Sequence, residues 1–284
     1  LFKKAYARFQ TEAPDNIQAS FAAFCAKQAF WLEDYALFTS LKAHFAHERA
    51  LGKGENDWIT FSQNTDNLLS DEEKQAYFAS ACWNSWPSAL RKRNGNTLKK
   101  WSRLLADAIT EEKFYQYLFS VQWQALKAYA NAKGISIIGD TPIFTAYDSA
   151  DVWAQQPLFQ LDSKGFPTVV SGVPPDYFCA DGQLWGNPLY QWKAHKKTDY
   201  LWWTNRIRKA LEDVDYLRID HFRAFESHWE VPFGAPNAIQ GEWKKGPGID
   251  FFHTLRRLLG DLPLIAEDLG IITDEVRALR EEAG

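Results

Sequence analysis

The chain has 284 residues, of which 46% are hydrophobic and 24% are charged, which is the composition of an ordinary soluble globular protein. At roughly 100 to 200 residues per domain, this length predicts one large domain or two of common size. The 32 Lys and Arg residues and 36 Asp and Glu residues give a net charge of -4, which leaves no basic excess for binding nucleic acid or anionic lipid. Composition therefore excludes a disordered chain, a collagen-like chain and a polybasic binding module.

The cysteines and the first residues indicate the compartment. Cys25, Cys82 and Cys179 are odd in number and far apart, so they form neither a CxxC metal pair nor a disulfide framework, which favours a reducing compartment. The first residues break their apolar run with Lys3, and no run of about 18 apolar residues occurs, so neither a signal peptide nor a membrane span is predicted. We expect a cytoplasmic protein. The chain contains no Met and begins at Leu1, which we interpret as processing or an internal fragment.

The first part of the chain, residues 1–115, is predicted to be mainly helical. Between residues 15 and 48, apolar residues recur at spacings of three, four and seven, which is the pattern of an amphipathic helix. Ser70 and Glu73 have the spacing of a capping box and predict the start of another helix. A further helix is expected over about 110–132.

From residue 116 onward, the pattern changes to alternating helices and short apolar strands. The strands are predicted at 135–138, 216–219 and 262–266, and helices over about 200–213 and 249–260 precede the second and third. Short, nearly continuous apolar strands between helices are typical of a parallel sheet covered by helices. Each strand is followed by acidic residues: Asp140, Asp220, and the pair Glu267 and Asp268.

These acidic residues favour one fold class. In a (β/α)8 TIM barrel, the carboxyl ends of the strands open into the active-site loops, so acidic residues there converge on one pocket. A doubly wound sheet would also place them at one edge, but the glycine-rich phosphate loop expected there is missing. Any single one is equally well explained as a helix N-cap. Their recurrence predicts an α/β fold of the barrel type with helical and loop insertions, its core at 116–284 and a long active-site loop at about 141–200.

The types of these residues suggest acid, base and nucleophile chemistry. Arg218 and Asp220 lie two apart on a strand, so they face the same way, and the cation would keep the carboxylate ionised as a nucleophile needs. Glu267 follows three apolar residues, and an apolar surround would suit it as a general acid. Such a pair is typical of retaining glycoside transfer. The competing interpretation is a metal site formed by Asp140, Asp220 and His221.

The segment 141–200 is rich in Pro, Gly and aromatic residues. Its aromatic residues lie among turn-forming residues rather than in a periodic core pattern: Tyr177, Phe178, Trp185, Tyr190 and Trp192. Aromatic faces beside Asp, Asn and Gln suit a sugar, which has apolar C–H faces and hydroxyl edges. Alternatively, the same rings only attach a long loop to the core of the protein.

Four long segments, in order, closely resemble the 4-α-glucanotransferases, also called amylomaltases, of glycoside hydrolase family 77. They are GDTPIFTAYDSADVW at 139–153, SGVPPDYFCADGQLWGNPLY at 171–190, LRIDHFRAFESHWEVP at 217–232 and PLIAEDLGIITDEV at 263–276. WLEDYALFTSLK at 31–42 also resembles that family. The resemblance covers nearly the whole chain, and strings of this length are far more specific than a single short motif.

The resemblance implies a cofactor-free and metal-free (β/α)8 barrel that acts on maltooligosaccharides and α-1,4-glucans by a retaining double displacement. The family's nucleophile on strand four falls on Asp220, and its acid/base on strand five falls on Glu267. By the same match, Arg218 would orient the nucleophile, and His221 and Asp268 would bind sugar hydroxyls.

The remaining matched positions surround this pair. Asp140 would support the site from strand three, whereas Asp176, Tyr177 and Trp185 would belong to the segment that covers the bound glucan.

The chain departs from the family pattern in length and in two small residues. The family's third catalytic Asp would lie after Gly284, and its first two strands before Leu1, so we expect an internal fragment holding about strands three to five, inactive alone. Cys179 and Ala224 stand where the family usually has Ser and Gly. The alternatives are a hydrolytic α-amylase-type glucanase and an inactive glucan-binding fragment.

Overall fold

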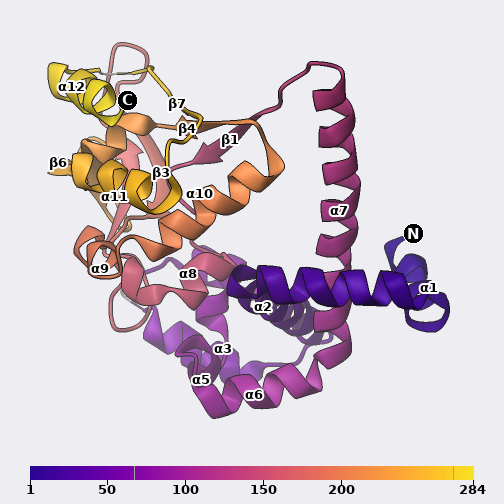
Figure 1. Ribbon diagram of the computed structural model, residues 1–284. Helices are drawn as coiled ribbons and strands as arrows, with labels where there is room; N and C mark the ends of the chain where they lie inside the picture. The colour runs from indigo at the N-terminus through magenta and orange to yellow at the C-terminus, as the bar shows by residue number, and fades with distance from the viewer. Residues whose placement is uncertain (67, 271) are drawn as a thin grey trace. The chain divides into compact units, whose positions relative to one another are not determined.

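The computed structural model describes residues 1–66, 68–270 and 272–284, which divide into two compact units (Figure 1). Unit 1 comprises Leu1–Trp123 and Asp148–Ala154, and unit 2 comprises Gln124–Tyr147 and Gln155–Gly284. The boundary predicted from the sequence lies between residues 115 and 116. The boundary between the two units instead lies between Trp123 and Gln124, within a helix that continues to residue 132. Among the described residues, no helix combines the length and the apolar character needed to cross a membrane.

Unit 1 is helical, as predicted for the first part of the chain. Its helices are α1 (Phe2–Glu12), α2 (Asp15–Ala50), α3 (Glu55–Asn64), α4 (Asp71–Ala79), α5 (Ser88–Arg91), α6 (Gly95–Leu104), the larger part of α7 (Ala106–Ala132) and α8 (Ala150–Ala154), with a 3-10 turn η1 (Trp83–Ser85). Helix α2 spans Asp15–Ala50, and between Ala36 and Leu41 its buried residues lie on more than one side of the helix. The helix predicted over 15–48 is therefore confirmed.

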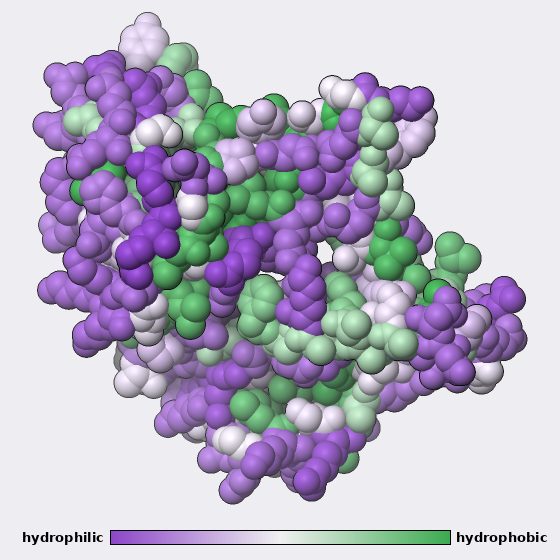
Figure 2. Space-filling model, in the orientation of Figure 1, coloured by the Kyte–Doolittle hydropathy of each residue, from purple (hydrophilic) through white to green (hydrophobic). Residues whose placement is uncertain are grey.

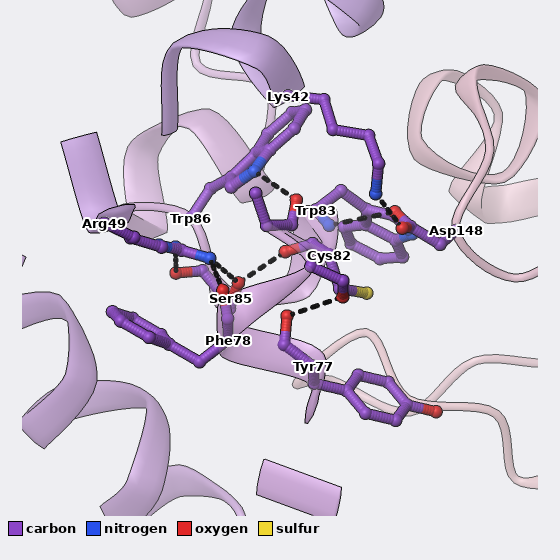
Figure 3. A network of polar contacts seen from close by, with 11 residues as sticks. Lys42, Arg49, Tyr77, Phe78, Cys82, Trp83, Ser85, Trp86 and Asp148 are labelled. Carbon is purple, nitrogen blue, oxygen red and sulfur yellow. Dashed lines mark hydrogen bonds and ion pairs between the residues drawn. The ribbon is translucent and has the colours of Figure 1, made fainter. Parts of the chain in front are cut away.

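A polar network holds η1 and the turn before it inside unit 1 (Figure 3). The Arg49 guanidinium donates to the carbonyl and the hydroxyl of Ser85, both at 2.9 Å, and to the Phe78 carbonyl, and it lies 3.8 Å from the centre of the Phe78 ring. Asp148 accepts a hydrogen bond from the Trp83 amide at 3.2 Å and pairs with Lys42. These hydrogen bonds give buried polar groups their partners, so the network stabilises the fold of unit 1.

The capping box predicted at the start of α4 is present. The Ser70 hydroxyl accepts from the Glu73 amide at 3.3 Å, and the Glu73 carboxylate accepts from the Ser70 amide at 2.7 Å. Ser70→Ala is expected to destabilise α4 by about 1 kcal/mol, because it leaves a helix-start amide without its acceptor. Hydrogen exchange of the α4 amides would measure this. Ser80→Ala, which removes a hydroxyl at the other end of the helix, is the matched control and should change exchange by less than about 0.5 kcal/mol.

Unit 2 contains the predicted parallel sheet. Its strands are β1 (Ile138–Pro142), β4 (Tyr216–Asp220) and β7 (Leu264–Ala266), paired in parallel in the order β1-β4-β7. Helix α10 (Leu201–Asp213) precedes β4, and α11 (Ile249–Leu259) precedes β7, as the alternating pattern indicates. The first strand begins three residues later than predicted. Just before it, the Ile137 carbonyl accepts a hydrogen bond from the Asp215 amide, and the Ile137 amide donates to the Asp215 carboxylate.

A second sheet lies in unit 2 that the sequence pattern did not indicate. It is antiparallel, in the order β3-β2-β5-β6, and consists of β2 (Val169–Val173), β3 (Gln183–Pro188), β5 (Ser227–Pro232) and β6 (Glu242–Lys245). The segment 141–200, expected as a long loop, therefore contains two strands, and it also contains the 3-10 turn η2 (Gln156–Leu158) and α9 (Trp192–Lys197). The 3-10 turn η3 (Phe222–Phe225) follows β4, and α12 (Asp274–Ala283) follows β7.

Candidate active site

Strand register brings acidic side chains from neighbouring strands to one face of the parallel sheet. Asp140 of β1 lies opposite Arg218 of β4. Residues two apart on a strand point to the same face, so Asp220 shares the face that carries Arg218. Glu267 follows β7 directly, and its amide donates to the Ile219 carbonyl at 3.2 Å, so the pairing of β7 with β4 continues to this residue. The carboxyl ends of the three strands thus meet at one place.

Arg218 joins the three carboxylates. Its Nη1 lies 2.6 Å from Asp140 Oδ1, and its Nη2 lies 3.0 Å from Asp220 Oδ1 and 3.0 Å from Glu267 Oε1. The hydrogen bond to Asp140, with the further bond to Asp220 and the charge of Glu267, raises the pKa of Arg218, so the guanidinium stays protonated. The predicted proximity of Arg218 and Asp220 is confirmed, and Asp140 and Glu267 belong to the same cluster.

The surroundings of Glu267 differ from the apolar surround that its sequence neighbours indicate. The side chain is 14% exposed, but one carboxylate oxygen pairs with Arg218 and the other accepts a hydrogen bond from the His221 amide. The expectation of an apolar surround is therefore wrong. Successive residues of a strand point to opposite faces, so Leu264 and Ala266 lie on the face of the sheet away from Glu267. The neighbours of Glu267 in space come from β4 and the turn after it.

His221 occupies the turn between β4 and η3. Its backbone φ of 54° is left-handed, which directs its amide toward Glu267. Its imidazole meets the Trp185 ring edge to face, with ring centres 4.8 Å apart. Burial, followed by the charge of Arg223, lowers the pKa of His221 to about 4. The imidazole is therefore neutral near pH 7, so it can donate a hydrogen bond to one hydroxyl group and accept one from another.

Phe144 is a residue of this site that sequence reasoning missed. It follows β1 in the segment GDTPIFTAYDS, and its ring lies 6.4 Å from Trp185 and 6.4 Å from His221. Its side chain is 7% exposed. The three rings together form an aromatic group beside the carboxylates. Its place directly after the strand that carries Asp140 is the one sequence signal that could have indicated it.

The structure does not join all predicted site residues to this cluster. Asp176 accepts hydrogen bonds from the amides of Phe178 and Cys179 within its own turn, and Tyr177 is 97% exposed. Asp268 lies 3.3 Å from Arg280 of α12. Within the described part of the chain, no hydrogen bond or ion pair connects Asp176, Tyr177 or Asp268 to Arg218.

The metal interpretation of Asp140, Asp220 and His221 is less well supported than an ion-pair cluster. Arg218 lies between the carboxylates, where that interpretation places a cation. Within residues 1–66, 68–270 and 272–284, no three His, Cys, Asp or Glu side chains are grouped as metal ligands. The guanidinium therefore supplies the positive charge that these carboxylates share.

A cavity of about 420 Å³ lies on the other face of the same sheet. It is lined by Ile219 and Ala266 of the strands and by residues of α11 and α12, among them Phe252 and Leu255. Ile219 points away from the face of Arg218 and Asp220, because neighbouring residues on a strand alternate. The cavity is therefore separate from the carboxylate cluster.

The chain matches known proteins over its whole length. The 4-alpha-glucanotransferase family, glycoside hydrolase family 77, matches residues 1–284. The chain is 44% identical over 282 residues to a 4-alpha-glucanotransferase of Thermus thermophilus and 43% identical over 284 residues to one of Synechocystis, covering 99% of this chain and 50% of the relative in both cases. It thus spans about half the length of these curated relatives.

A solved structure gives the same result. The amylomaltase from Streptococcus agalactiae, determined in complex with acarbose, superposes with a TM-score of 0.83 at 35% sequence identity, over 99% of this chain and 50% of that one. Because the family matches the whole chain and the fold is similar as well, the chain belongs to the 4-alpha-glucanotransferase family, glycoside hydrolase family 77.

Proposed function

We propose that this chain carries the nucleophile and the acid/base of a 4-α-glucanotransferase. The observation that carries the proposal is the shared contact of Asp220 and Glu267 with Arg218 Nη2. Both carboxylate oxygens lie 3.0 Å from that nitrogen, so they are separated by at most twice this distance. Retaining glycosidases hold their two carboxyl groups about 5 to 5.5 Å apart and inverting ones about 6.5 to 9.5 Å apart. The shared contact supports retention.

The reaction would proceed by double displacement. Glu267 protonates the glycosidic oxygen of the donor while Asp220 attacks the anomeric carbon, which gives a covalent glucosyl-enzyme and a shortened glucan. Glu267, now a base, removes the proton from the 4-hydroxyl of an acceptor glucan, which attacks the same carbon and releases Asp220. Arg218, whose Nη2 lies 3.0 Å from Asp220 Oδ1, orients this carboxylate for its attack and pairs with it again when it is released.

The groups around the two carboxylates suit a sugar. The neutral His221 imidazole can exchange hydrogen bonds with a ring hydroxyl, and the Trp185 ring beside it offers a flat face. Asp176, Tyr177 and Asp268 remain proposed glucan contacts. Asp176 and Tyr177 would reach the sugar when substrate binding moves the segment around the highly exposed Tyr177, and Asp268 would do so from the segment after β7. The proposed substrates are maltooligosaccharides and α-1,4-glucans, without a cofactor. The cytoplasmic localisation stays a prediction.

We also propose that β1, β4 and β7 are strands three to five of a (β/α)8 barrel. The face that carries Asp140, Arg218 and Asp220 exposes apolar side chains nearer the strand starts: Ile138 is 63%, Tyr216 46% and Ile265 37% exposed. Figure 2 shows hydrophobic surface in the region where β1 and β4 are drawn in Figure 1. Inward-facing residues of this kind fill a barrel interior, with the polar residues at its carboxyl end.

Incubation with maltotriose alone tests the proposed function. The protein made from its complete coding sequence is expected to convert maltotriose into glucose and a ladder of longer maltodextrins, detected by chromatography with pulsed amperometric detection. A ladder requires that a sugar, rather than water, receives the glucosyl group. Products no longer than maltotriose would support the hydrolytic alternative, and binding to amylose without any new product would support the inactive glucan-binding alternative.

A further inference from the structure

A carboxylate and an imidazole are buried together on β5, away from the proposed catalytic pair. His228 is 3% exposed and Glu230 is 9% exposed, and His228 Nε2 lies 3.1 Å from Glu230 Oε1. Gln160 Nε2 donates to the same oxygen at 2.9 Å. Burial raises the pKa of Glu230, but the hydrogen bonds from His228 and Gln160 outweigh it and lower the pKa overall. A buried carboxylate lowers the stability of the fold unless it is paired and hydrogen-bonded. Its presence at this position therefore suggests a role beyond packing.

Phe144 lies between this buried pair and the proposed active site. The His228 ring meets the Phe144 ring edge to face, with centres 6.5 Å apart. The same Phe144 ring lies 6.4 Å from Trp185 and 6.4 Å from His221, which themselves lie 4.8 Å apart. A displacement of Phe144 would therefore reach both residues that are proposed to meet the sugar.

The backbone on both sides of Phe144 is held independently of His228. The Tyr190 hydroxyl donates to the Ile143 carbonyl at 2.6 Å, and the Asn187 amide group donates to the Thr145 carbonyl at 3.0 Å. With the backbone fixed at both neighbours, the position of the Phe144 ring depends on the side chains that pack against it. His228 is one of them, and Glu230 with Gln160 sets its orientation.

We infer that His228 and Glu230 are positioning residues for the proposed glucan site, which fix the Phe144 ring and through it the placement of Trp185 and His221. Neither residue touches the sugar. The inference rests on the proposed function for its kinetic consequence, whereas its structural consequence, the placement of Trp185, is independent of any reaction. Loss of the Glu230 carboxylate releases the His228 ring, and Phe144 then supports Trp185 less rigidly.

The test combines kinetics with a spectroscopic readout in the protein made from the complete coding sequence. Glu230→Leu is expected to raise KM for maltotriose about tenfold with a smaller change in kcat, and Glu230→Gln, which keeps an oxygen acceptor for His228, is expected to restore most of the lost affinity. The protein labelled with 5-fluorotryptophan gives a separate fluorine resonance for Trp185, assigned with Trp185→Phe. Without substrate, this resonance is expected to shift in Glu230→Leu and to return in Glu230→Gln.

Val231→Ala is the matched control for general loss of stability. Val231 is fully buried on the same strand, but its side chain points to the opposite face and packs with Val170 and Ala238. It is expected to lower the melting temperature without moving the Trp185 resonance or KM. An unchanged Trp185 resonance in Glu230→Leu, or an equal shift in Val231→Ala, would overturn the inference. Failure of the wild type to elongate maltotriose would count against the proposed function and leave the resonance test intact.

Discussion

Replacing Asp220 with Asn is expected to lower glucan transfer about 10⁴-fold or more, both with maltotriose and with an activated donor such as 4-nitrophenyl α-maltotrioside. The amide lacks the negative charge that attacks the anomeric carbon, so no covalent intermediate forms with either donor. Its oxygen can still accept a hydrogen bond from Arg218, which lies 3.0 Å from Asp220, so the fold is expected to persist. Circular dichroism and thermal unfolding would check this.

Glu267→Gln is expected to distinguish its role from that of Asp220. With maltotriose, transfer should fall about 10² to 10⁴-fold, because the glycosidic oxygen is no longer protonated. With the activated donor, nitrophenolate leaves without protonation, so about one equivalent per enzyme should appear quickly. Turnover then stalls, since the acceptor hydroxyl lacks its base. A stopped-flow absorbance trace would show this burst.

Asp261→Asn is the control for both variants, because it also removes one carboxylate, from an exposed residue that pairs with Arg256. It should transfer glucan at close to the wild-type rate. Near-normal transfer by Asp220→Asn would refute the nucleophile assignment, and the absence of any burst in Glu267→Gln would contradict an acid/base role limited to proton transfer.

The two carboxylates could be predicted from the sequence because the relevant information is local. A strand of continuous apolar residues ends where polar residues begin, and parallel strands bring such ends together, so Asp220 and Glu267 were expected at one edge. The same is true of α2 and of the capping box at Ser70, which depend on spacings within a few residues. These features follow from period and composition.

The features that could not be predicted depend on contacts between distant parts of the chain. Strand β2 pairs with β5. Gly172 interrupts the pattern of β2, and β5 alternates polar and apolar residues only from His228 to Val231, which is too short a pattern to identify a strand. Glu267 follows three apolar residues in sequence, yet its carboxylate contacts Arg218 from another strand. Phe144 resembles any apolar residue that follows a strand, and only its distances to Trp185 and His221 indicate its place.

Acidification is expected to destabilise unit 2 through His195 of α9. His195 is fully buried among aromatic rings, with ring centres 5.2 Å from Tyr190, 5.4 Å from Trp192 and 5.9 Å from Trp202. Burial lowers its pKa from 6.5 to about 4. Between these pH values the unfolded chain binds a proton that the folded chain does not, so stability falls as pH decreases through this window. At about 1.4 kcal/mol per pKa unit, the loss amounts to about 3 kcal/mol.

Hydrogen exchange of the α10 amides, corrected for intrinsic rates, would measure the unfolding free energy of unit 2 between pH 8 and pH 4.5. His195→Phe keeps an aromatic ring but cannot bind a proton, so its stability should depend on pH less steeply than that of the wild type. The difference between the two proteins at pH 8, where the unfolded histidine is neutral, reports the packing change alone. Subtracting it isolates the titration. Parallel pH profiles for both proteins would show that the buried imidazole binds its proton without opening the aromatic cluster, and would contradict the assigned cause.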